Sequence, residues 1–141
     1  MYNIDINKLK FKRIHYIKKK KNYIDFLKFG NFGLKTKKLI LFKEIHLKLI
    51  LKYLIRKLKK IGKFWIKTFF NITLTKKSTG ARMGGGVGKI NQWGIFLKPG
   101  KILLEIYSNI KNKNSIFKYL KYCIKKLPKG LKIISNLKNF F

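Results

Sequence analysis

A glycine-rich segment in the middle of the chain has the composition of a phosphate-binding loop. It reads Gly84-Gly85-Gly86-Val87-Gly88-Lys89. A deviant phosphate-binding loop, roughly K-G-G-V-G-K-[ST], surrounds phosphate with backbone N–H groups and holds Mg²⁺ with a hydroxyl. Gly84 replaces the first lysine of that pattern, and Ile90 stands where the hydroxyl is needed. The residues that follow read as loop and strand rather than helix, so an NTPase is disfavoured, even with Glu105 as a candidate acid beside the metal.

The same segment, residues 76–91, also suits RNA. It holds five of the 11 glycines and little that can anchor a core. Glycines let a backbone approach a ligand closely, and Arg82 and Lys89 supply positive charge. A merely flexible surface loop is the plainest alternative, but a long loop in so small a domain is more often functional.

Side chains for acid–base or metal chemistry are scarce. The carboxylates are limited to Asp5, Asp25, Glu44 and Glu105, which nearly excludes catalysis by paired carboxylates. Cys123 is the only cysteine, and His15 and His46 lie far apart, so neither a disulfide nor a zinc site is expected. We therefore predict no metal site.

The charge balance points to a polyanionic partner. The 141 residues include 36 Lys or Arg and only 4 Asp or Glu, which gives a formal net charge of +32. A hydrophobic fraction of 46% and an aromatic fraction of 15% are too high for a disordered tail, so we expect one folded domain over residues 1–141. Its surface would repel itself without nucleic acid around it. Within residues 1–23, the run KLKFKRIHYIKKKK predicts a basic arm laid along phosphates, and a solvated terminus is the alternative.

The periodicity along the chain predicts an α+β fold, with a mixed or antiparallel sheet and two packed helices. Residues 43–60 repeat apolar side chains at the helical period, including Ile45, Leu49 and Ile55, and Gly62 is a natural stop. A second amphipathic helix is expected after Ser115 as its cap and before Pro128.

Strands are expected in the β-branched and aromatic segments. Residues 63–75 read as one strand, residues 92–98 and 101–107 as a hairpin about Pro99-Gly100, and residues 131–135 as a last strand. The two Phe-Gly steps of FGNFGLK predict a bend beside a short strand. We expect Trp65 and Trp93 to pack against the helices, with base stacking as the alternative.

Several segments resemble the large-subunit ribosomal protein L sixteen family. ARMGGGVGKINQWGIFLKPGKILLEI resembles the family's R-M-G-K-G-K-G-x-x-x-x-W-V-A-x-V-K-P-G-x-x-L-F-E. FGNFGLK and GKFWIKTF resemble its F-G-x-F-G-L-K and G-K-x-W-I-R-x-F, and KFKRIH and KKLP resemble its two ends. The likeness covers nearly the whole chain.

The resemblance implies a structural protein of the large ribosomal subunit that is not an enzyme and has no cofactor, because catalysis in that subunit belongs to the RNA. Such a protein would bind rRNA near the peptidyl-transferase region, border the aminoacyl-site tRNA and touch neighbouring ribosomal proteins, without membrane insertion. Together with the charge pattern, it predicts RNA contacts at Lys10, Lys12, Arg13, His15, Lys18, Lys19, Lys20, Lys35, Lys76, Lys77, Arg82, Met83, Gly84, Gly86, Gly88 and Lys89. A cationic membrane-surface protein built on the 43–60 helix is the alternative from another class, but it leaves the glycine loop unexplained.

The chain departs from the family pattern inside the loop, where Gly85 and Val87 replace two lysines. Plastid and bacterial members stay closer to the pattern. The avoidance of Arg, which occurs only at Arg13, Arg56 and Arg82, fits an A/T-rich organellar genome. The N-terminal residues show neither an apolar signal core nor transit-peptide composition. These features predict a mitochondrial ribosome and a mitochondrial gene, with the plastid as the alternative.

Overall fold

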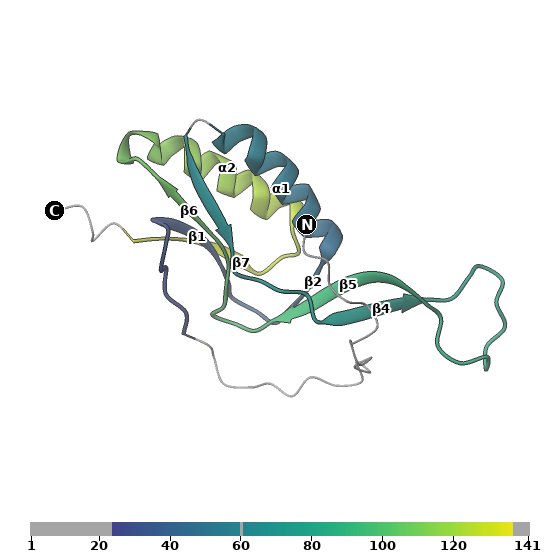
Figure 1. Ribbon diagram of the computed structural model, residues 1–141. Coiled ribbons are helices and arrows are strands. Elements are labelled where there is room, and N and C mark those ends of the chain that lie inside the picture. The colour runs from purple at the N-terminus through teal and green to yellow at the C-terminus, as the bar shows by residue number, and fades with distance from the viewer. Residues whose placement is uncertain (1–23, 60, 137–141) are drawn as a thin grey trace.

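Two helices lie side by side on one face of an antiparallel sheet in the computed structural model, which describes residues 24–59 and 61–136 (Figure 1). The elements are β1 (Phe32–Thr36), β2 (Ile40–Lys43), α1 (Glu44–Leu58), β3 (Gly62–Ile66), β4 (Ile72–Lys76), β5 (Lys89–Leu97), β6 (Ile102–Ser108), the 3₁₀ turn η2 (Ile110–Asn112), α2 (Lys113–Lys126) and β7 (Leu131–Ser135). The described strands form a four-stranded sheet, β3-β6-β1-β7, and a three-stranded sheet, β2-β5-β4. This arrangement confirms the predicted α+β class.

The helix α1 forms where the sequence predicts it, but its buried stripe is narrower than expected. Ile50, Leu54 and Leu58 are buried at intervals of four residues. The expected inward positions Ile45 and Leu49 lie outside this stripe and are 49% and 57% exposed. Arg56 and Lys57 in the last turn suit the negative end of the helix dipole.

Two boundaries predicted for the helices are wrong. The helix α1 ends at Leu58, and Gly62 is the first residue of β3 rather than the stop of the helix. The helix α2 begins at Lys113 with Asn112 in the cap position, so Ser115 lies inside the helix. Pro128 follows the end of α2 as predicted, because proline cannot continue a helix.

The predicted strand over residues 63–75 is two strands in different sheets. Its first part, β3, pairs with β6, and its second part, β4, pairs with β5. Residues 67–71 carry the chain from one sheet to the other, and the ring of Phe70 stacks on that of Phe42 with 6.3 Å between centroids. The continuous β-branched and aromatic composition of residues 63–75 therefore does not indicate where the chain changes from one sheet to the other.

The predicted hairpin about Pro99-Gly100 is also wrong, because β5 and β6 belong to different sheets. The buried Thr36, at the end of β1, holds the turn between them. Its hydroxyl donates to the carbonyl of Lys98 at 2.5 Å and accepts from the N–H of Lys101 at 3.1 Å. Its own carbonyl accepts from the N–H of Gly100 at 2.8 Å. These contacts direct the chain into a crossover between sheets.

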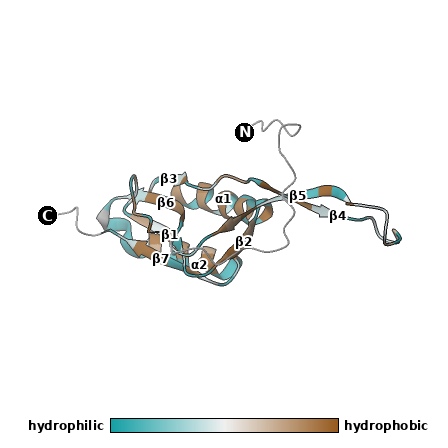
Figure 2. Ribbon diagram, turned by 90° about the horizontal axis from the view of Figure 1, so that it is seen from below, coloured by the Kyte–Doolittle hydropathy of each residue, from teal (hydrophilic) through white to brown (hydrophobic). Residues whose placement is uncertain are grey.

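The core lies between the helices and the sheet, and the hydrophobic colouring of Figure 2 concentrates there. Phe32, Leu34 and Ile106 fill it from the strands, and Leu54 and Leu120 fill it from the helices. Neither Trp65 nor Trp93 belongs to this core, so the prediction that both pack against the helices is wrong. Phe64 contacts the core, and side chains alternate along a strand, so the adjacent Trp65 lies on the other face of β3.

Candidate nucleic-acid interface

The glycine-rich loop projects away from the body at the end of the β4–β5 hairpin (Figure 1). The strands reach further into it than predicted: Lys76 ends β4 and Lys89 begins β5, so the loop is residues 77–88 rather than 76–91. Every residue from 78 to 87 is exposed, including Arg82, and Met83 is 92% exposed. The loop therefore offers its whole surface to a partner and contributes nothing to the core.

The loop requires glycine at different positions for different structural reasons. Gly80, Gly84 and Gly86 have φ values of +82°, +100° and +74°, in the left-handed region where other residues are strained. Gly88 is required by space, because a Cβ there would lie 2.5 Å from the backbone carbonyl of Lys76. Gly85 has neither a positive φ nor a neighbour within 4 Å.

Positive charge is concentrated at the base of the loop. Lys76 and Lys89 are directly opposite each other in the β4–β5 ladder, and both are exposed. Like charges in such a cross-strand pair repel each other, and a phosphate beside them would relieve that repulsion. Lys77 follows immediately, so the structure brings Lys76, Lys77, Arg82 and Lys89 together on one projecting hairpin.

The other predicted RNA contacts are not gathered at this hairpin. Lys35 lies on β1 in the four-stranded sheet, where its ammonium donates to the backbone carbonyl of Asp25 at 3.0 Å and is half-buried. The contacts predicted in the basic arm all lie outside the described residues: Lys10, Lys12, Arg13, His15, Lys18, Lys19 and Lys20.

A buried carboxylate, which the sequence suggests only as a candidate acid beside a metal, has a structural role. Glu105 is 0% exposed and accepts hydrogen bonds from the backbone N–H groups of Lys28, Phe29 and Gly30 at 2.7–3.2 Å. The ammonium of Lys67 lies 2.8 Å from the same carboxylate. Burial alone would raise the pKa of Glu105, but Lys67 and the three N–H groups lower it below the ordinary value of 4.5. The ion pair thus fixes residues 24–31 on the sheet face away from the helices.

Neither metal nor nucleotide chemistry finds support in the described residues. They contain no group of three or more His, Cys, Asp or Glu placed to hold a metal ion. His46 instead accepts a hydrogen bond at Nδ1 from the N–H of Lys43 at 3.2 Å, at the start of α1. A strand, β5, follows the glycine loop where a nucleotide-binding loop needs a helix. None of the described helices is long and apolar enough to cross a membrane.

Comparison with known proteins identifies the family. The profile of ribosomal protein L16p/L10e matches residues 6–134. The chain belongs to this family. It is also 37% identical over 131 residues to the large ribosomal subunit protein uL16c of Euglena longa, an alignment that covers 90% of this chain and 94% of that protein.

Membership of the L16p/L10e family confirms the predicted role. The protein is a structural constituent of the large ribosomal subunit, and it is not an enzyme. The match spans the described fold, including the projecting hairpin and the strand that carries Glu105. Ribosomal RNA and ribosomal proteins are accordingly its partners.

The close contact at Gly88 predicts a specific defect in the hairpin. Gly88→Ala should push β4 and β5 apart at Lys76, since the new methyl group meets backbone that cannot move aside easily. Overpacking of this kind costs about 1–3 kcal/mol. Amide hydrogen exchange should accelerate around Thr75 and Ile90, which are partners in the same ladder. Gly85→Ala is the matched control and should leave exchange unchanged, whereas equal exchange in both variants would contradict the steric argument.

The Glu105–Lys67 pair predicts a dependence of stability on pH. Because the folded-state pKa of Glu105 lies below 4.5, its contribution is complete above that pH and is lost as the pH falls through the folded value. Glu105→Gln removes the charge and leaves Lys67 poorly compensated, which should cost about 3–5 kcal/mol in urea unfolding at pH 7.

Glu44→Gln provides the control for this experiment. The carboxylate of Glu44 pairs with Lys48 at 2.7 Å on the exposed side of α1. Pairs of this kind contribute only about 0.3–0.5 kcal/mol. Similar losses in the two variants, or an acid-unfolding profile that Glu105→Gln leaves unchanged, would show that the buried pair does not anchor residues 24–31.

Proposed function

We propose that the loop of residues 77–88 contacts functional RNA of the large subunit, near the peptidyl-transferase region and beside the aminoacyl-site tRNA. The observation that carries this proposal is an arginine within the fully exposed residues 78–87 of a loop whose base holds three lysines. A guanidinium can bind phosphate through two donors or stack on a base, and an ammonium can do neither. Arg82 is thus the main RNA contact of the loop.

The rest of the protein binds rRNA through its lysines. Among the described residues, the ion pairs to Asp25, Glu44 and Glu105 involve only Lys48 and Lys67. The remaining described lysines therefore contribute to a surface of one sign, which neutralises RNA phosphates on assembly. The basic arm within residues 1–23 extends this interaction in the proposal.

The loss of two family lysines makes the loop more dependent on Arg82. Gly85 and Val87 stand at those positions, and Val87 is 71% exposed. Each replacement removes one cation that could meet a phosphate. Contacts by Met83 and by the backbone at Gly84, Gly86 and Gly88 complete the proposed interface.

The protein functions in an organellar ribosome in this proposal. The lost loop lysines at Gly85 and Val87 favour a mitochondrion, as predicted. The name of the Euglena longa relative, uL16c, carries the suffix used for plastid members and favours the plastid. The A/T-rich composition is common to both kinds of organellar genome, so the plastid is the location that we propose. Mass spectrometry of purified plastid and mitochondrial ribosomes should find the chain in the plastid fraction, and its presence only in the mitochondrial fraction would reverse this assignment.

Replacing Arg82 with lysine tests the role of the loop. Arg82→Lys keeps the charge but loses bidentate and stacking contacts, so it should slow accommodation of aminoacyl-tRNA or peptide-bond formation. The loss of one good charged contact corresponds to roughly 1.5–3 kcal/mol. Incorporation of the variant into subunits should be normal, because no core contact involves the loop.

The matched control is Arg56→Lys. Arg56 is also exposed, but it lies on α1, where its guanidinium donates to the carbonyl of Lys52 at 3.2 Å. Rates are measured on purified ribosomes by rapid kinetics with labelled aminoacyl-tRNA. If ribosomes carrying Arg82→Lys translate at the parental rate, the assignment of the loop fails.

A further inference from the structure

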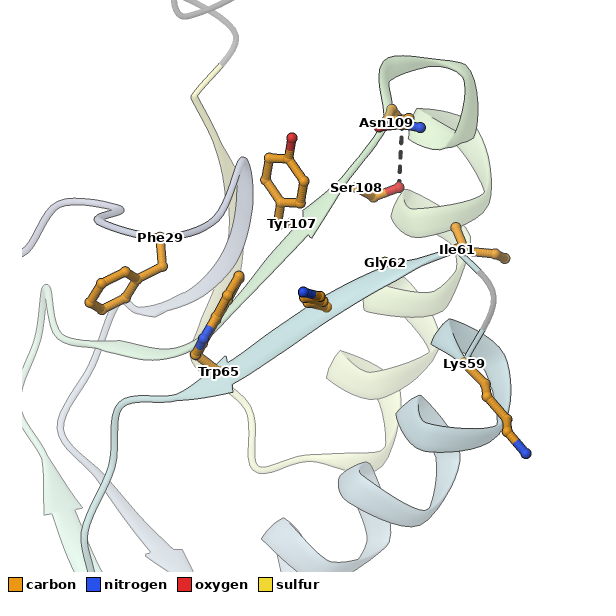
Figure 3. Close-up of a pocket in the computed structure, with 9 residues that line it drawn as sticks. Phe29, Lys59, Ile61, Gly62, Trp65, Tyr107, Ser108 and Asn109 are labelled. Carbon is orange, nitrogen blue, oxygen red and sulfur yellow. Dashed lines mark hydrogen bonds between the residues drawn. The ribbon is translucent and has the colours of Figure 1, made fainter.

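A second surface, distant in sequence from the glycine loop, has the features of a nucleotide-binding cleft. A cleft of about 620 Å³ opens beside the edge strand β3, and Phe29, Trp65, Tyr107, Lys59, Lys63 and Asn109 are among its lining residues (Figure 3). Pockets that hold small ligands have volumes of ~300–1,000 Å³. Three aromatic rings and Lys63 thus line an open surface cleft of suitable size, whereas the side chain of Lys59 at its margin points away from the rings (Figure 3).

The strand register explains why these side chains meet. Lys63 is opposite Tyr107 in the β3–β6 ladder, and Trp65 is opposite Glu105. Alternation along both strands places Lys63, Trp65 and Tyr107 on one face, away from the helices. The sheet therefore presents two aromatic rings and a cation side by side.

The third aromatic ring, that of Phe29, is positioned by the buried ion pair. Glu105 holds the N–H of Phe29 at 2.7 Å and so fixes the segment that carries its side chain. The rings of Phe29 and Trp65 are then 5.9 Å apart between centroids, with an angle of 36° between their planes. Glu105 is thus a positioning residue for this cleft.

Two of these aromatic side chains, Phe29 and Tyr107, are exposed to solvent rather than packed in the core. Phe29 is 60% exposed and Tyr107 is 45% exposed, although both lie on ordered segments. The strand β3 is at the edge of the four-stranded sheet. Aromatic rings with exposed faces, next to lysines, are the arrangement on which proteins stack single-stranded bases.

We propose that this cleft binds an unpaired nucleotide of the large-subunit rRNA. Its base stacks on the rings of Tyr107 and Trp65 beside Phe29, its phosphate lies near Lys63, and the amide of Asn109 meets polar atoms of the base. Charge complementarity favours RNA over a protein segment, since the described lining residues include two lysines and no carboxylate. The inference rests on rRNA binding by the protein but not on the role of the loop.

Binding of the full-length chain to protein-free large-subunit rRNA tests the proposal. Tyr107→Ala should weaken binding about 5- to 150-fold, the range expected for loss of one stacked base. The loss should be the same at every salt concentration, because stacking releases no counterions. Lys63→Gln should instead reduce the slope of log affinity against log salt by about 0.7. Excess unrelated double-stranded RNA is present throughout to suppress non-specific binding.

Tyr122→Ala is the matched control, because Tyr122 is 44% exposed and stacks on Tyr53 at the helices. It should leave affinity within twofold of the parental value, and circular dichroism should show all variants folded. Unchanged binding by Tyr107→Ala, or an equal loss in Tyr122→Ala, would overturn the proposal. So would a loss seen only with subunits that retain their proteins, which would assign the cleft to a neighbouring protein. If the parental chain itself fails to bind rRNA, the premise fails rather than the cleft.

Discussion

The pairing of Glu105 with Lys67 is the interaction on which the sheet face away from the helices depends. Glu105 is the one fully buried carboxylate among the described residues. Its contacts join three parts of the chain: residues 24–31, the connection after β3, and β6. A buried carboxylate is costly unless it is paired and hydrogen-bonded. Here four donors satisfy it, so the segment ahead of β1 is held in place and Phe29 reaches Trp65.

Because the chain has only 4 acidic residues against 36 Lys or Arg, its surface is dominated by lysines. With a formal charge of +32, the protein repels itself, and RNA phosphates relieve that repulsion on assembly. The fold then presents its cations in two different ways. The β4–β5 hairpin extends Arg82 away from the body on a glycine-rich loop, whereas the cleft beside β3 places Lys63 opposite Tyr107 among aromatic side chains.

The sequence predicts local features well and the exchange between sheets poorly. The period of 3.6 residues locates α1, and residues 131–135 form β7 as expected. The sequence could not reveal that residues 63–75 change sheets at 67–71, because both halves have the same β-branched and aromatic composition. It also could not predict that Thr36 directs β5 and β6 into separate sheets, since that contact spans more than 60 residues. The glycines of the loop identify it within one segment of the sequence. The cleft depends on the pairing of β3 with β6, which no single segment predicts.

We propose that two separate surfaces of this protein, the hairpin loop and the cleft beside β3, both meet RNA in the assembled subunit. A cryo-electron microscopy reconstruction of the organellar large subunit, at a resolution that shows side chains, tests it most directly. The account predicts Arg82 within hydrogen-bonding distance of RNA on the tRNA-facing side, and a single base stacked in the cleft formed by Phe29, Trp65 and Tyr107. An Arg82 side chain surrounded by solvent, together with a cleft filled by a protein side chain, would contradict it.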